Sequence, residues 1–232
     1  MLQSKDFEFL TFDCYGTLID WEAGIVATLM PILRTHHVNI SDAELLELYG
    51  EFEALSESGP YQNYRAVLAS VVRQCGKRYG FEPSPDESAA LGNALPRWHP
   101  WPDTIDALRK LERQFSLAII SNIDDDLFSE TRRNFPVHFA HVFTAQQVRC
   151  YKPGLEIFRS ALATIGLSPD RVLHVGQSLY HDVRPAQSLG LSTVWVNRPS
   201  ARPNVGAVRK IDALPDLEVR DLRTLSEFLL SY

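Results

Sequence analysis

Short apolar runs alternate with longer amphipathic stretches over most of this chain. The apolar runs cover Phe9–Phe12 and residues 117–120, 142–143, 172–175 and 193–196. Stretches with helical periodicity lie between and after them, at residues 103–114, 125–134, 155–165, 182–189 and 221–230. Continuous apolar strands separated by helices are typical of a parallel sheet covered on both faces. The pattern therefore predicts an α/β fold whose sheet includes the first apolar run.

Only helical periodicity is present from about residue 21 to residue 98. The apolar stripes of this segment lie at residues 25–33, 45–55 and 64–72, with a weaker one at 88–95. Four such helices predict a small bundle inserted after the first strand. We expect the bundle to lie over the carboxyl ends of the strands, where ligands bind in open parallel sheets. The predicted domains are a core of residues 1–20 and 99–232 and an all-helical cap of residues 21–98.

Composition and charge narrow the possible partners. The 232 residues are 45% hydrophobic and 22% charged, and their net charge of −6 includes no basic run, so we expect no nucleic acid partner. No stretch approaches the roughly 20 apolar residues that span a bilayer, and a strand beginning at Phe9 leaves no room for a signal peptide. Cys14, Cys75 and Cys150 fit neither a disulfide framework nor a zinc site. We expect a cytoplasmic protein without a membrane partner.

Two further expectations concern the surface. Residues 199–203 are predicted to form a surface loop without chemistry of its own. An exposed apolar stripe on a cap helix would permit a homodimer. The pattern alone does not fix the oligomeric state.

The segment Asp13-Cys14-Tyr15-Gly16-Thr17 directly follows the first predicted strand. Gly16 allows a sharp turn, so the Asp13 carboxylate is presented to a cleft and not to bulk water, and Thr17 adds a hydroxyl there. Such a carboxylate can act as a nucleophile and form a covalent ester. The alternative is a strand end with an Asx-type turn before a helix, and this motif alone does not decide between the two.

Polar groups also follow three later strands. They are Ser121-Asn122, Lys152-Pro153, and Gly176-Gln177-Ser178 with Asp182. The first pair could hold an oxyanion or a substrate carboxylate. The lysine would pair with Asp13 and keep it ionised and oriented. The hydroxyl, amide and carboxylate of the last segment could position a water for attack on an ester.

Some neighbouring polar residues have a structural explanation. Asp124, Asp125 and Asp126 are suited to cap the helix that they begin, where acids complement the helix dipole. We therefore interpret them as capping residues and not as a metal site. His174 lies within a strand and is expected to be a satisfied core histidine, and His181 is expected at the surface.

The four segments, in the order Asp-x-Tyr-Gly-Thr, Ser-Asn, Lys-Pro and Gly-x-Ser-x-x-x-Asp, resemble the motifs of the haloacid dehalogenase superfamily. The resemblance covers the whole chain and implies a Rossmann-like core with a mobile helical cap. It implies that the catalytic residues are Asp13, Lys152, Ser178 and Asp182. The substrate-binding residues it implies are Tyr15, Thr17, Ser121, Asn122 and Gln177.

Two positions separate the branches of this superfamily. Phosphatase members have an aspartate where this chain has Tyr15, and usually an acid that helps to hold magnesium where it has Gln177. Asp-x-Tyr-Gly-Thr instead resembles the L-2-haloacid dehalogenase branch, which needs no metal and no general acid because halide leaves unprotonated. The chain departs from that branch at Glu44, where the branch has a cap arginine, and at Phe158, where it has a tyrosine.

Three segments are similar to a related hydrolase that opens the ring of L-azetidine-2-carboxylate: residues 12–20, 121–123 and 178–182. We therefore expect an enzyme without metal or other cofactor. It would displace halide or a ring nitrogen from the α-carbon of a small 2-substituted carboxylic acid through an aspartyl ester. The alternative is a magnesium phosphatase of a small phosphomonoester, with Asp13 and Asp182 as ligands. A binding protein without activity is disfavoured, because Asp13, Lys152 and Asp182 are all present.

Overall fold

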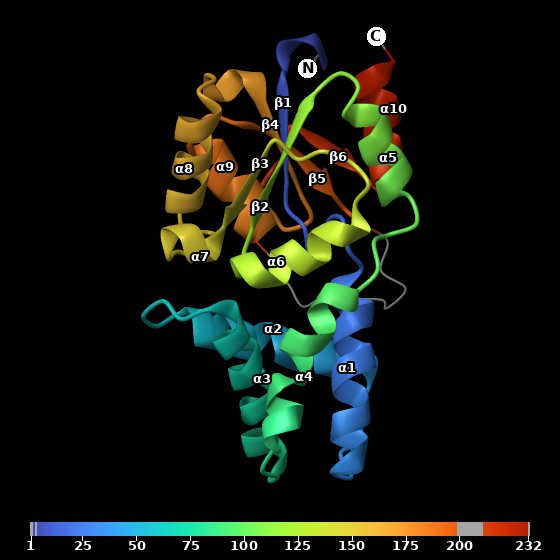
Figure 1. Ribbon diagram of the computed structural model, residues 1–232, viewed down its shortest axis with the longest axis vertical. Helices are drawn as coiled ribbons and strands as arrows, with labels where there is room; N and C mark the ends of the chain where they lie inside the picture. The colour runs from blue at the N-terminus through green and yellow to red at the C-terminus, as the bar shows by residue number, and fades with distance from the viewer. Residues whose placement is uncertain (1, 3, 199–210, 232) are drawn as a thin grey trace.

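The core of the computed structural model is a six-stranded parallel sheet (Figure 1), and the structure describes residues 2, 4–198 and 211–231. The strand order is β3-β2-β1-β4-β5-β6. The strands are β1 (Phe9–Phe12), β2 (Ser116–Ser121), β3 (His141–Thr144), β4 (Val172–Gly176), β5 (Ser192–Val196) and β6 (Leu217–Val219). The predicted α/β class is confirmed. β6 was not predicted, and the loop expected at 199–203 lies outside the described residues.

Helices cover both faces of the sheet, as continuous apolar strands require. Ala118 and Ile120 of β2 pack with residues of α8 (Glu156–Ile165) and α9 (Arg184–Ser188). Their neighbours Leu117 and Ile119 point to the other face and join a cluster with α5 (Thr104–Leu111) and α10 (Leu222–Leu230). The two remaining core helices are α6 (Asp125–Thr131) and α7 (Ala145–Val148).

The predicted bundle is present as four helices beyond the carboxyl ends of the strands (Figure 1). They are α1 (Trp21–Thr35), α2 (Asp42–Glu57), α3 (Tyr64–Tyr79) and α4 (Pro85–Ala94). Polar side chains cap the first turns of α2 and α4. In α2, Ser41 accepts a hydrogen bond from the Glu44 backbone amide, and in α4, Ser84 forms a reciprocal capping box with Glu87. We call this bundle the cap and the rest of the chain the core. The exact division at residues 20 and 99 stays a prediction.

The two segments that join cap and core run side by side. The Asp20 amide donates to the His99 carbonyl at 3.0 Å, and the Trp101 amide donates to the Leu18 carbonyl at 3.0 Å. A short β-bridge pairs Ile19 with Pro100. Both covalent connections therefore lie in one hydrogen-bonded strip.

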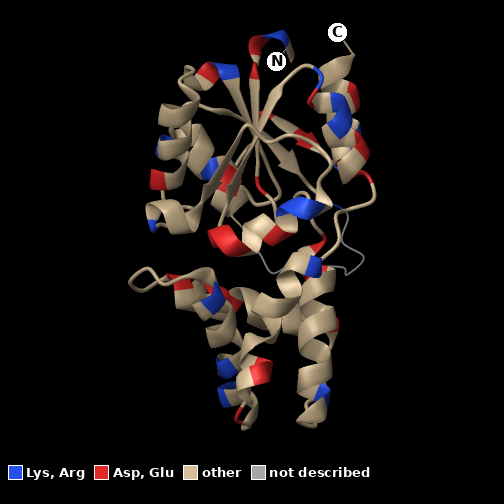
Figure 2. Cartoon of the chain, in the orientation of Figure 1, with Lys and Arg blue, Asp and Glu red and all other residues tan. Residues whose placement is uncertain are grey.

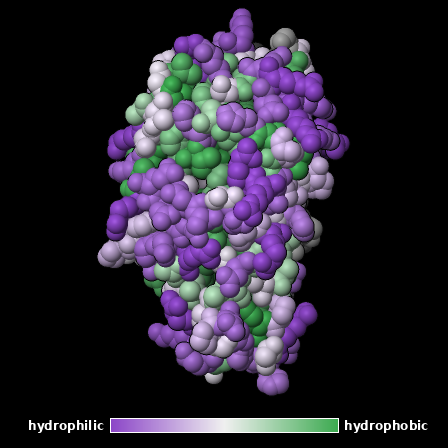
Figure 3. Space-filling view, in the orientation of Figure 1, coloured by the Kyte–Doolittle hydropathy of each residue, from purple (hydrophilic) through white to green (hydrophobic). Residues whose placement is uncertain are grey.

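The surface carries few large apolar side chains. The face shown in Figure 3 is largely hydrophilic, with hydrophobic residues in separate patches. Within the described ranges, the exposed large hydrophobic residues are Leu55 and Leu214, so no apolar stripe is exposed on a described cap helix. No helix among the described residues is long and apolar enough to span a membrane.

Candidate active site

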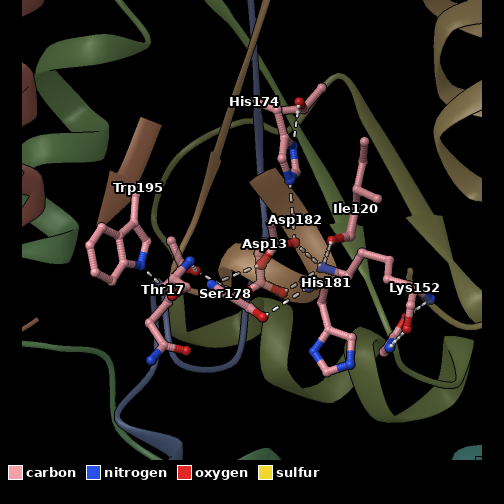
Figure 4. Close-up of polar contacts among 12 residues, drawn as sticks. Asp13, Thr17, Ile120, Lys152, His174, Ser178, His181, Asp182 and Trp195 are labelled. Carbon is pink, nitrogen blue, oxygen red and sulfur yellow. Dashed lines mark hydrogen bonds and ion pairs between the residues drawn. The ribbon is translucent and has the colours of Figure 1, made fainter. Parts of the chain in front are cut away.

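The predicted motifs meet where β1, β2 and β4 end side by side (Figure 4). Asp13 directly follows β1, and its amide donates to the Val175 carbonyl of β4 at 2.9 Å. Ser121 is the last residue of β2. Asp182 lies in a π-helical turn, Leu179–Val183, which begins three residues before the helix predicted at 182–189. Parallel alignment of these strands brings together side chains that are far apart in the sequence.

Lys152 is the centre of the site. Its Nζ donates to Asp13 Oδ1 at 2.8 Å, to Asp182 Oδ1 at 2.6 Å and to the Ile120 carbonyl at 3.1 Å. The side chain is 2% exposed. Burial acts to lower its pKa, but the two carboxylates outweigh that effect and raise the pKa of Lys152 above its ordinary value. Lys152 is therefore a permanent cation whose three ammonium hydrogens are all used.

Both oxygens of Asp13 are held in place. Oδ1 is bound by Lys152, and Oδ2 accepts a hydrogen bond from Thr17 Oγ1 at 2.6 Å. The Thr17 hydroxyl in turn accepts a hydrogen bond from the backbone amide of Gln177 at 2.8 Å. Burial raises the pKa of Asp13, and the Lys152 and Thr17 contacts act in the opposite direction. Thr17 thus orients the carboxylate, and its hydroxyl is fully engaged.

Asp182 is buried on the other side of the lysine. Its Oδ1 lies 3.3 Å from His174 Nε2, and its Oδ2 accepts from the Ser178 amide at 3.2 Å. Although burial acts to raise it, Lys152 and His174 hold the pKa of Asp182 well below its ordinary value. His174 is fully buried, as expected, and bonds Thr11 Oγ1. Its contact with Asp182 was not predicted.

Three more predicted residues shape the site. Ser178 Oγ accepts from the His181 amide at 2.9 Å and so begins the turn that carries Asp182. The Asn122 side chain bonds both the amide and the carbonyl of Lys152, at 2.7 and 3.1 Å. The Tyr15 hydroxyl bonds Thr131 Oγ1 at 2.8 Å. These contacts make Ser178 and Asn122 positioning residues for Asp182 and Lys152.

Ser121 differs from these residues. It is 1% exposed, and its hydroxyl has no hydrogen-bond partner among the described residues. Because a buried hydroxyl without a partner is costly, such a group calls for a ligand or water. Ser121 is thus a free donor at the end of β2.

A cavity of about 50 Å³, which we call the inner cavity, lies between these core residues and the cap. All predicted site residues except Thr17 line it, together with Trp21, Glu53, Glu57, Tyr64 and His181. A larger adjoining cavity of about 380 Å³, which we call the outer cavity, is also lined by Glu53, Glu57, Lys152 and His181. Asp13 therefore faces a partly open space with a wider space beside it.

Two expectations about neighbouring residues were wrong. His181 is half-buried and lines both cavities, and burial lowers its pKa to about 4. It is not an ordinary surface residue, because the turn at Ser178 directs it toward the cap. Asp124 does not cap its own helix: its two carboxylate oxygens accept from the amides of Tyr64 and Arg65, at 2.8 and 2.9 Å. This core residue therefore caps α3 of the cap.

Sequence reasoning missed the cap residues of the cavity. Glu53 and Glu57 lie one turn apart on α2, and Glu53 belongs to the buried stripe that contains Leu45, Tyr49 and Phe52. A carboxylate in the apolar stripe of a helix is unusual. That departure from the pattern was the available signal.

The family can now be assigned from comparison with known proteins. The sequence model of the family of haloacid dehalogenase-like hydrolases matches residues 8–190 of this chain. The chain belongs to this family. The superfamily resemblance of the motifs is thereby confirmed, and the protein is a hydrolase of this family.

Relatives of this hydrolase include enzymes with different substrates. The (S)-2-haloacid dehalogenase H-109 of Pseudomonas putida is 27% identical over 97% of this chain and 99% of the relative. The glyceraldehyde 3-phosphate phosphatase of Methanopyrus kandleri is 30% identical over 77% of each chain. The structure of the L-2-haloacid dehalogenase from Xanthobacter autotrophicus, with chloropropionic acid covalently bound, covers 96% of this chain and 98% of that one, with a TM-score of 0.79 and 21% identity. This last likeness shows the fold.

Proposed function

We propose that this hydrolase displaces a leaving group, halide or a ring nitrogen, from the α-carbon of a small 2-substituted carboxylate, with Asp13 as nucleophile. One observation carries the proposal. Lys152 and Thr17 each bind one oxygen of the Asp13 carboxylate, and Asp13 lines the cavity. The dehalogenase relatives, and the covalent complex of one of them, support the same chemistry.

In the first step an Asp13 oxygen attacks the α-carbon, an aspartyl ester forms, and the leaving group departs with the bonding electrons. Halide leaves without a proton, and a protonated ring nitrogen leaves as an amine. Neither case needs a general acid, and Tyr15 stands where the phosphatase members have one. Burial raises the pKa of Tyr15 well above its ordinary value, so it remains a neutral phenol. The Ser121 hydroxyl is available to bind a substrate carboxylate oxygen.

In the second step a water attacks the ester carbonyl of Asp13 and releases a 2-hydroxy acid. Asp182 and Ser178 line the cavity beside that carbonyl. The low pKa of Asp182 makes it a weak base, so its role is to orient the water as a hydrogen-bond acceptor. Lys152 remains protonated and stabilises the oxygen that becomes negative during hydrolysis.

The donor set does not fit the magnesium ion of phosphatase relatives. Lys152 Nζ binds both Asp13 and Asp182, and a dication would compete with that ammonium for the same carboxylates. Tyr15 and Gln177 supply no carboxylate, whereas magnesium prefers several oxygen ligands. Among the described residues no group of three or more His, Cys, Asp or Glu side chains is arranged to hold a metal. We therefore propose that turnover needs no metal.

A product assay separates the proposal from the phosphatase alternative, which the phosphatase relatives favour. The purified enzyme is given L-2-chloropropionate, L-azetidine-2-carboxylate or p-nitrophenyl phosphate, each with and without EDTA. We expect 2-hydroxy acid from at least one carboxylate, undiminished by EDTA, and little phosphate release. Phosphate release that EDTA abolishes and magnesium restores, with neither carboxylate turned over, would replace this proposal by the phosphatase.

A further inference from the structure

Two acidic side chains of the cap face the nucleophile across the inner cavity. Glu53 and Glu57 lie near the end of α2, and both line the cavity that contains Asp13. Glu53 is 8% exposed and Glu57 is half-buried. Figure 2 shows acidic segments on both sides of the boundary between cap and core, on α2 and on α6. Carboxylates are rarely buried unless they are paired.

Neither acidic side chain has a cationic partner within the described part of the chain. Two neutral hydroxyls, Tyr49 Oη at 3.0 Å and Tyr64 Oη at 2.5 Å, donate to the same Glu53 oxygen, Oε1. In the described part of the chain, no Lys or Arg forms an ion pair with Glu53 or Glu57. Burial raises the pKa of Glu53 to about 7 and that of Glu57 well above its ordinary value, so both side chains hold a proton more readily than free carboxylates until a cation binds beside them. The tyrosines orient Glu53 without supplying the missing positive charge.

The cavity has more acidic groups than cations to pair with them. Its acidic lining residues are Asp13, Asp182, Glu53 and Glu57, and Lys152 also lines it. The single cation is already shared by Asp13 and Asp182. The lowered pKa of His181 keeps that side chain neutral at pH 7. A ligand cation beside Glu53 and Glu57 would stabilise their ionised forms, and a ligand that carried only a carboxylate would give them no such partner.

A nearby arginine does not pair with the two glutamates. Arg149 lines the outer cavity together with Glu53 and Glu57, but its guanidinium stacks on Tyr61 at 5.5 Å. The unpartnered Ser121 hydroxyl, on the core side, is an independent sign that the inner cavity takes a ligand with an acceptor oxygen. The cavity thus offers a donor on the core side and two acidic side chains without a cationic partner on the cap side.

We propose that Glu53 and Glu57 bind a positively charged nitrogen of the substrate, which is then a zwitterionic amino or imino acid and not a simple 2-substituted anion. The inference rests on the proposed function, since it names the substrate class of the same site. The ammonium group lies toward α2, and the carboxylate lies toward Ser121. Glu53 and Glu57 act here as specificity-determining residues, and Tyr49 and Tyr64 position Glu53.

The test compares two ligands of the same shape. L-alanine and isobutyrate differ only in an ammonium group in place of a methyl group, and neither has a leaving group. Their binding to the full chain is measured by isothermal titration or by NMR chemical shifts. We expect L-alanine to bind at least about tenfold more tightly, which corresponds to about 1.4 kcal/mol. Equal binding, tighter binding of isobutyrate, or no binding of L-alanine would overturn the proposal.

Single substitutions test whether Glu53 and Glu57 cause the preference for L-alanine. Glu53→Gln and Glu57→Gln should each weaken L-alanine binding about tenfold and leave isobutyrate unchanged or bound more tightly. Glu51→Gln is the matched control, because Glu51 is exposed on the same helix and lines neither cavity. Thermal unfolding of each variant excludes loss of fold. If both cavity variants are folded and retain the wild-type preference, the assignment of Glu53 and Glu57 is wrong.

This binding test does not depend on turnover. A protein that prefers L-alanine but hydrolyses no 2-substituted carboxylate would refute the proposed function and keep the cation subsite. A protein that hydrolyses L-2-chloropropionate but shows no preference for L-alanine would keep the proposed function and lose the subsite.

Discussion

At the scale of single residues, the site is organised by one buried cation between two carboxylates. Lys152 fixes one oxygen of Asp13 and one oxygen of Asp182. The Thr17 hydroxyl bonds the Asp13 carboxylate, the Ser178 backbone amide bonds the Asp182 carboxylate, and the Asn122 side chain bonds the Lys152 backbone. Thr17 and Asn122, which were expected to touch substrate, thus help to hold the charged residues in place. Ser121 remains as the predicted residue with a free donor.

Lys152→Met should damage both stability and activity. The variant leaves two buried carboxylates without their cation, and removing one partner of a buried ion pair typically costs about 3–5 kcal/mol. We expect a loss of that size in the free energy of unfolding, measured by urea denaturation near pH 7, together with loss of turnover. Lys110→Met is the control, because Lys110 is exposed. An unchanged free energy of unfolding would contradict the bridging role of Lys152.

The sequence could predict the charged residues of the site but not its cap side. The core motifs follow strands, and parallel strands bring their carboxyl ends to one edge, so Asp13, Ser121 and Lys152 could be placed together. Glu53 and Glu57 line the cavity only because α2 packs against the core. That packing depends on contacts between distant segments, which a local pattern does not contain.

At the scale of elements, the continuous apolar runs predicted the first five strands and the helices that cover them. The sixth strand was missed because Leu217–Val219 is short and has a glutamate in the middle. Asp124 shows a second limit. Its position before α6 is typical of a helix cap, but the amides that it accepts belong to α3, about sixty residues earlier in the chain. Local spacing cannot reveal a partner at that distance.

Asp124→Ala should loosen the contact between α3 and the core. The substitution removes two hydrogen bonds to the first turn of α3, and loss of a helix cap costs about 0.5–2 kcal/mol. We expect faster hydrogen exchange at the amides of Tyr64 and Arg65 and a higher KM. Asp124→Asn, which retains a capping oxygen, should restore much of the wild-type behaviour. Unchanged exchange at both amides in Asp124→Ala would refute the interdomain cap.

At the scale of the whole molecule, the cavity lies between cap and core, and the two covalent connections between them lie in one strip. The strip contains the hydrogen bonds from Asp20 to His99 and from Trp101 to Leu18. A cavity between two domains changes its width when one domain moves, and a strip with two connections is suited to act as the hinge of that movement. Contacts such as Asp124 with α3 would then close the cap over a bound ligand.

Ligand binding should therefore slow hydrogen exchange at the strip. L-2-chloropropionate or L-azetidine-2-carboxylate, whichever the product assay identifies as substrate, is added to Asp13→Asn, which cannot turn it over. We expect slower exchange at the amides of Asp20 and Trp101, with little change at α8, which lies outside the strip and serves as an internal control. With binding verified separately, exchange that stays the same at both amides would argue against a closing cap.

The proposed covalent ester between Asp13 and the substrate is tested most directly by a single turnover in ¹⁸O-labelled water, with enzyme in excess over substrate and analysis of the peptide that contains Asp13. Because water attacks the ester carbonyl, the label should enter the Asp13 carboxylate, and the hydroxy acid of the first turnover should be unlabelled. Asp13→Asn should lose turnover by several orders of magnitude. Label found only in the hydroxy acid, with none in Asp13, would show direct attack by water and contradict the account.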